Sequence, residues 1–105
     1  MLYKKNYFFL LIRVFFHRSK TIIKKKYYQN NVIGTLNLIK CCKSSNIKSI
    51  VFSSSCSIYG NTIGAVNENK RANPIGYYAR TKYEGEKIII KYAKGYNYNY
   101  AILRY

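Results

Sequence analysis

The chain has 105 residues, which is room for one domain at most. Its 19 Lys and Arg residues face only three acidic residues, so the formal net charge is +16, which favours contact with polyanions and weakens a compact state by self-repulsion. Three cysteines without C-x-x-C spacing and a single histidine argue against a zinc site or a disulfide framework. We therefore expect no metal site and a reduced, cytoplasmic protein.

The first 29 residues differ from the rest of the chain. They contain eight Lys or Arg residues, no acidic residue and no glycine, and they surround an apolar run, 7–16, that Arg13 interrupts. This run is too short to span a membrane, which takes about 20 apolar residues, and no small-residue cleavage site follows it. Two interpretations stay open: a buried strand, or a segment outside the fold. We treat 1–29 as an atypical N-terminal segment and 30–105 as the domain.

A regular pattern begins at residue 30. Asn30 and Asn31 are suited to cap a helix, because an apolar stripe with helical spacing follows them. The apolar, β-rich run Ile47–Phe52 predicts a central strand buried on both faces. Three serines, Ser53–Ser55, follow at once, so this strand carries hydroxyl groups at its carboxyl end.

Three further elements complete the chain. A loop over 60–73 ends with turn residues before Gly76, a helix is predicted over 77–94 with Gly95 as its cap, and 100–105 alternates as a strand. Helix, strand, loop, helix and strand in this order are typical of a parallel α/β sheet. We therefore predict an α/β fold: a partial, Rossmann-like parallel sheet in which two strands lie side by side with two main helices on their faces. Because two strands do not complete such a sheet, we expect the chain to be a piece of a longer domain.

One constellation of residues has catalytic potential. Tyr78 and Lys82 are four residues apart in the predicted helix, so both side chains lie on one face. Moving a phenol from a pKa of about 10 to near neutrality takes roughly 4 kcal/mol, and one nearby cation in a partly desolvated site supplies energy of that order. A serine hydroxyl from the strand end would bond the same substrate oxygen. Together these groups would transfer the proton of an alcohol that is being oxidised.

The spacing Tyr-x-x-x-Lys alone is a weak indication in a chain with 13 tyrosines, but its context is specific. Four motifs occur in order: NNVIGTLNL at 30–38, VFSSSCSIYG at 51–60, NP-x₇-K at 73–82, and LRY at 103–105. Together they strongly resemble the UDP-glucose 4-epimerases of the NAD-dependent epimerase/dehydratase family, within the extended short-chain dehydrogenases/reductases. The resemblance covers about 27–105.

This resemblance implies a role for four residues. Tyr78 matches the catalytic tyrosine, and Lys82 matches the lysine that assists it and holds the nicotinamide ribose. Ser55 matches the serine that bonds the sugar's 4-oxygen, and Asn30 matches an asparagine that contacts NAD. In such enzymes the phenolate removes the proton of the 4-hydroxyl while NAD takes the hydride from C4, and the hydride then returns to the other face.

Related dehydratases carry an Asp-Glu pair directly after the strand's hydroxyl residue. Here these positions are Cys56 and Ser57, so the resemblance favours an epimerase. The resemblance also implies a UDP-sugar substrate, is compatible with a homodimer of the full-length enzyme, and implies no specific nucleic-acid or membrane partner.

The N-terminal glycine-rich turn of such enzymes, G-x-x-G-x-x-G, has no counterpart, because 1–29 contain no glycine. We therefore expect the isolated chain to bind NAD weakly and to be inactive. The alternative is a small basic protein that binds nucleic acid or a membrane surface and carries Tyr-x-x-x-Lys by chance.

Overall fold

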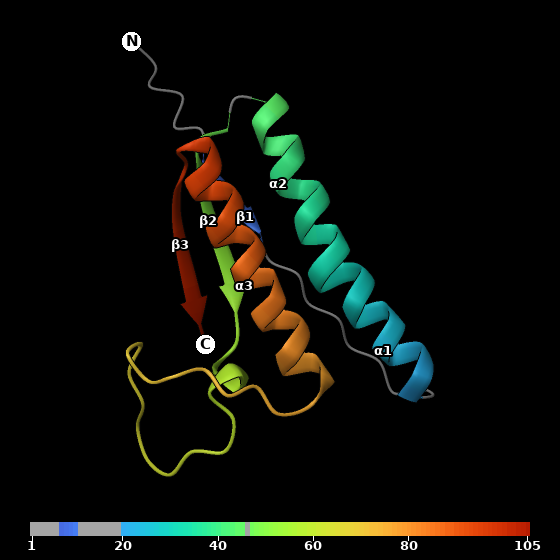
Figure 1. Ribbon diagram of the computed structural model, residues 1–105, viewed down its shortest axis with the longest axis vertical. Coiled ribbons are helices and arrows are strands. Elements are labelled where there is room, and N and C mark those ends of the chain that lie inside the picture. The colour runs from blue at the N-terminus through green and yellow to red at the C-terminus, as the bar shows by residue number, and fades with distance from the viewer. Residues whose placement is uncertain (1–6, 11–19, 46) are drawn as a thin grey trace.

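The computed structural model describes residues 7–10, 20–45 and 47–105. Its elements, in chain order, are β1 (Tyr7–Leu10), α1 (Lys20–Tyr28), η1 (Gln29–Ile33), α2 (Gly34–Ser44), β2 (Ser49–Ser54), η2 (Cys56–Tyr59), α3 (Tyr77–Tyr96) and β3 (Asn99–Arg104). Over the described residues, three strands form one parallel sheet in the order β1-β2-β3 (Figure 1). The predicted α/β class with parallel strands is confirmed, as is the parallel pairing of β2 with β3.

The sheet has one strand more than the two predicted. β1 pairs with β2 in parallel, with Tyr7 opposite Ser49 and Leu10 opposite Phe52. Of the two interpretations of the N-terminal apolar run, the strand therefore holds for Tyr7–Leu10, and the rest of the run lies outside the described residues. The domain boundary placed at residue 30 stays a prediction.

The first long helical segment begins earlier than predicted. The helix expected from Asn30 starts at Lys20 and continues through η1 and α2 to Ser44. The capping role predicted for Asn30 and Asn31 is therefore wrong, because both lie inside this segment. η1 is a single π-helical turn, in which the amide of Gly34 donates to the carbonyl of Gln29. Such turns insert one extra residue and rotate the following side chains.

The hydrophobic core lies between the sheet and two helices. α2 and α3 lie side by side over one face of the sheet (Figure 1). The core residues come from α2, β2 and α3: Ile39, Cys42, Ile50, Phe52 and Ile89. Strand β2 lies between its two neighbours, as predicted for the central strand, and its last residues are buried.

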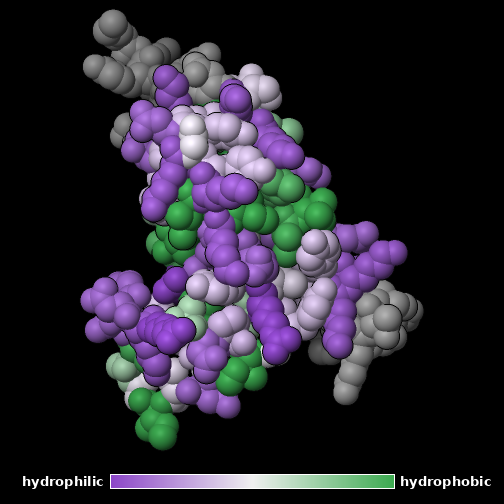
Figure 2. All heavy atoms as spheres, viewed as in Figure 1, coloured by the Kyte–Doolittle hydropathy of each residue, from purple (hydrophilic) through white to green (hydrophobic). Residues whose placement is uncertain are grey.

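A long connection joins η2 to α3. Residues 61–71 are all exposed, and the connection returns to the body where the amide of Asn73 donates to the carbonyl of Ile58 at 2.8 Å. α3 follows Gly76, whose φ of 84° favours glycine, and ends at Asn97 in the left-handed conformation, two residues beyond the predicted cap. Figure 2 shows polar and charged side chains over much of this face, with hydrophobic patches between them. No helix among the described residues is long and apolar enough to cross a membrane.

Candidate active site

Helix α3 positions two of the predicted site residues. Tyr78 and Lys82 are the second and sixth residues of α3, so the i, i+4 spacing places them on one face of the helix. Their environments differ: Tyr78 is 37% exposed, whereas Lys82 is 2% exposed. Tyr78 is therefore partly exposed at the surface, whereas the side chain of Lys82 is enclosed by protein.

Lys82 is held against the end of β2. Its Nζ donates to the carbonyl oxygen of Ser53 at 3.0 Å and lies 5.5 Å from the centre of the Phe52 ring. Burial lowers the pKa of this ammonium below its usual value near 10.5. The contact with Ser53 brings the basic group within two residues of the predicted Ser55.

Ser55 follows β2 directly and caps η2. Its Oγ accepts one hydrogen bond from the amide of Ser57 at 3.1 Å and another from the Oγ of Ser57 at 2.8 Å. A hydroxyl has two acceptor lone pairs and one donor hydrogen. Ser57 therefore holds the Ser55 hydroxyl in place at the start of η2.

The two adjacent asparagines take different roles. Asn30 is exposed on η1, whereas Asn31 is 1% exposed and its Nδ2 donates to Oγ1 of Thr81 at 3.1 Å. Thr81 in turn donates to the carbonyl of Tyr78 at 2.8 Å. Asn31 and Thr81 thus connect η1 to the turn of α3 that carries Tyr78 and Lys82. Sequence reasoning missed this pair.

An aromatic neighbour of Tyr78 was also missed. The ring of Tyr27, at the end of α1, lies edge-on to the ring of Tyr78, with 5.3 Å between centroids and 64° between planes. Such edge contacts favour one ring orientation over others. The adjacent Tyr27 and Tyr28 were the only indication of this contact in the sequence. The sequence does not show which of the two faces α3.

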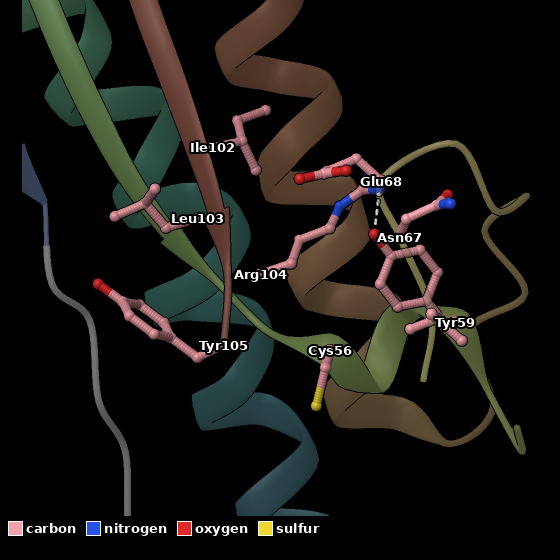
Figure 3. A pocket seen from close by; sticks show the side chains of 9 residues that line it. Cys56, Tyr59, Asn67, Glu68, Ile102, Leu103, Arg104 and Tyr105 are labelled. Carbon is pink, nitrogen blue, oxygen red and sulfur yellow. Dashed lines mark hydrogen bonds between the residues drawn. The ribbon is translucent and has the colours of Figure 1, made fainter. Parts of the chain in front are cut away.

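A cavity of about 770 Å³ lies at the carboxyl end of β3 (Figure 3). It is lined by the end of β3 with Tyr105, by two residues of η2 and by 66–68 of the long connection. Arg104 projects toward Tyr59 at its wall, where the dashed line in Figure 3 marks their hydrogen bond. The four predicted site residues are not among its lining residues.

Within the described part of the chain, no three His, Cys, Asp or Glu side chains lie close enough to hold a metal ion. Tyr78 and Lys82 share one face of α3, and the Lys82 ammonium bonds the end of β2 two residues before Ser55. These groups are suited to move a proton to and from an alcohol oxygen.

Comparison with known proteins identifies the family of the chain. The profile of the NAD dependent epimerase/dehydratase family matches residues 12–105. A UDP-glucose 4-epimerase from Rhizobium leguminosarum bv. trifolii is 39% identical over 80 residues, which is 75% of this chain and 24% of that protein. A putative UDP-glucose 4-epimerase from Methanocaldococcus jannaschii is 42% identical over 77 residues, 71% of this chain and 25% of that protein.

Solved structures give the same result. UDP-glucose 4-epimerase from Brucella ovis in complex with NAD is 40% identical, with a TM-score of 0.73 over 77% of this chain and 25% of its own. UDP-glucuronic acid 4-epimerase from Bacillus cereus in complex with NAD has a TM-score of 0.83 at 29% identity, over 95% of this chain and 32% of its own. The chain thus spans about a quarter of the length of these two curated relatives. On the extent of the profile match, the chain belongs to the NAD dependent epimerase/dehydratase family.

Proposed function

We propose that this chain carries the proton-transfer centre of an NAD-dependent UDP-sugar 4-epimerase, an isomerase. The observation that carries the proposal is the position of the Lys82 ammonium: it is buried, bonded to the strand-end carbonyl of Ser53, and one helical turn from the exposed Tyr78. Membership of the family and the names of the relatives, which are UDP-sugar 4-epimerases, support the choice of reaction.

Each residue has one task in this proposal. Tyr78 accepts the proton of the sugar's 4-hydroxyl and later returns it. Lys82 stabilises the phenolate, because a buried positive charge favours the negative form of a neighbouring group. Ser55 donates a hydrogen bond to the same 4-oxygen, and its contacts with Ser57 hold its hydroxyl in place.

The residues of this chain supply part of a binding site for NAD. Tyr78 and Lys82 would hold the nicotinamide ribose, and the exposed amide of Asn30 would contact NAD from η1. When bound, NAD supplies the hydride acceptor. Residues 1–29 contain no glycine, so they do not build the turn that cradles a pyrophosphate. The isolated chain should therefore bind NAD far more weakly than a complete enzyme and show no turnover, and a micromolar affinity in a calorimetric titration would contradict this.

The substrate class follows from the relatives. The matched proteins are named for UDP-glucose and UDP-glucuronic acid, so we propose a UDP-hexose or its acid as substrate. A cytoplasmic location and a homodimer of the full-length enzyme stay predictions.

A graft tests the function directly. Residues 27–105 replace the matching segment of the Rhizobium leguminosarum epimerase, which then supplies the remaining three-quarters of its own length. We expect this grafted enzyme to interconvert UDP-glucose and UDP-galactose, because the segment brings its own Tyr78, Lys82 and Ser55. A graft that is folded and binds NAD but shows no turnover would overturn the proposal. A graft with the same segment and Lys82→Ala is the matched control, which should be strongly impaired.

A further inference from the structure

A second buried charge lies on the same face of α3, one turn beyond Lys82. Glu86 is 1% exposed, and three donors reach its carboxylate. Oε1 accepts from the Oγ of Ser54 and from Nε of Arg104 at 3.0 Å, while Oε2 accepts from Nη2 of Arg104 at 2.8 Å. The hydrogen bonds to Glu86 raise the pKa of Arg104, so the guanidinium stays charged. The carboxylate is thus paired bidentately, the geometry that fixes both partners in orientation.

Arg104 extends this contact to η2. Its Nη1 donates to the hydroxyl of Tyr59 at 3.0 Å, and its Cζ lies 5.1 Å from the centre of the Tyr59 ring. Figure 3 shows the side chain of Arg104 reaching from β3 to Tyr59 at the cavity wall. Tyr59 is itself buried, so its ring and its hydroxyl are both held.

The two ends of this network bracket Ser55. Ser54, which bonds Glu86, directly precedes it, and Tyr59, which bonds Arg104, ends the turn that Ser55 caps. The backbone between them is also tied to the end of β3, where the amide of Cys56 donates to the carbonyl of Tyr105 at 2.6 Å. The position of Ser55 relative to α3 is therefore set from both sides.

A contribution to folding stability does not by itself explain a buried ion-pair network of this kind. Replacing a buried ion pair by apolar residues of similar volume is often neutral or stabilising, because the pair bears a desolvation cost. What the polar arrangement adds is fixed direction: a bidentate ion pair and two hydroxyl contacts allow one geometry, where apolar packing allows several.

From these contacts we infer that Glu86 and Arg104 form a clamp that positions Ser55 against the Tyr78–Lys82 face of α3. Neither residue touches the reacting atoms, so both are positioning residues. The inference rests on the proposed function, since that function gives Ser55 its task. It adds that the exact place of the Ser55 hydroxyl depends on a charge pair 18 residues apart in sequence, between α3 and β3.

Amide hydrogen exchange on the 105-residue chain tests the clamp without any need for activity. The two reporters are the amide of Ser57, which bonds the Ser55 hydroxyl, and the amide of Cys56. In Glu86→Gln we expect exchange at both to rise about ten- to a hundredfold, the factor that corresponds to a lost hydrogen bond to a charged group. The amide of Ile47, at the end of α2, should change much less. An equal rise at all three amides, or none, would overturn the clamp.

Two further variants keep the test decisive. Glu84→Gln removes the same charge from the same helix at an exposed pair with Lys87, and it should leave the three amides unchanged. If Glu86→Gln fails to fold, Tyr59→Phe decides the question, because it removes only the hydroxyl contact with Arg104. It should raise exchange at Cys56 and Ser57 and spare Ile47, and a uniform rise or no rise would overturn the clamp.

Activity separates this inference from the function on which it rests. In the grafted enzyme, Tyr59→Phe should lower kcat about tenfold and leave KM unchanged, as expected when a donor to the transition state is misplaced. An inactive graft with local exchange effects would leave the clamp standing and refute the function. An active graft in which Tyr59→Phe and Glu86→Gln change neither kcat nor local exchange would refute the clamp alone.

Discussion

Two polar regions of the molecule contrast sharply: the contact between α3 and the end of β2, and the connection 61–71. In the first, the polar side chains of Ser53, Ser54, Thr81, Lys82 and Glu86 are buried, and the buried Asn31 of η1 bonds Thr81. No buried side-chain nitrogen or oxygen of the described residues lacks a hydrogen-bond partner. In the connection, every residue is exposed, so its polar groups can form hydrogen bonds with water. At the α3–β2 contact, burial of the polar groups costs desolvation free energy, which their hydrogen bonds offset. Functional sites are expected in such places.

The sharpest thermodynamic test of this contrast is a pair of threonine substitutions. Thr81→Val keeps the shape of the side chain but removes the oxygen that Asn31 donates to, so it should destabilise the chain by about 1–3 kcal/mol. Thr62→Val, in the exposed connection, should change the free energy of unfolding by less than about 0.5 kcal/mol. Urea denaturation of both variants checks this, and equal effects would remove the contrast between the two regions.

Two glycines of α3 give the next largest difference. A Cβ at Gly85 would lie 2.8 Å from Cζ of Phe52 and 3.0 Å from the carbonyl oxygen of Asn31, whereas nothing lies within 4 Å of one at Gly95. Gly85→Ala should therefore destabilise the chain by about 1–2 kcal/mol, since overpacking outweighs the gain in helix propensity.

Gly95→Ala is the control, and it should stabilise the chain by up to about 1 kcal/mol. Thermal unfolding of both variants provides the measurement. A stabilising Gly85→Ala would mean that α3 approaches β2 and η1 less closely than described.

The pH dependence of stability isolates Lys82. Its lowered pKa means that the unfolded state binds more protons between that pKa and about 10.5, so its contribution to stability is least favourable at low pH and rises across this window. Burial raises the pKa of Cys42 above its usual 9.0, which acts in the opposite direction above that pH. The test is therefore the difference in unfolding free energy between the wild type and Lys82→Met, measured in steps of about one pH unit up to pH 10.5, where the window ends. It should shift in favour of the wild type as pH rises, and a flat difference would refute the buried, desolvated position of Lys82.

The smallest effect is expected in the connection. Ile63 is fully exposed, so Ile63→Ser should change the unfolding free energy by less than about 0.5 kcal/mol. A decrease in the unfolding free energy of more than about 1 kcal/mol in urea denaturation would show that the Ile63 side chain is packed against other residues.

The sequence predicts the elements whose periodicity is local. The apolar run before the serines predicts β2, and the alternation over 100–105 predicts a strand that the structure places at Asn99–Arg104. The four-residue spacing predicts the helical face shared by Tyr78 and Lys82. The roles of Asn30 and Asn31 cannot be predicted from such local spacing, because a π-helical turn decides which of the two faces α3. β1 stayed ambiguous because its apolar run is short and contains an arginine. The partner of Glu86 is equally hidden, since Arg104 comes from another element and only the fold brings them together.

The central claim is that Tyr78 moves the substrate's proton, and its neighbour Tyr77 supplies the matched control. In the grafted enzyme, kcat is measured for Tyr78→Phe and Tyr77→Phe under identical conditions. We expect Tyr78→Phe to lose about 10²–10⁴-fold, the usual contribution of a positioned acid or base, while Tyr77→Phe stays near the parent value. Near-normal turnover in Tyr78→Phe, or equal losses in both variants, would contradict the account.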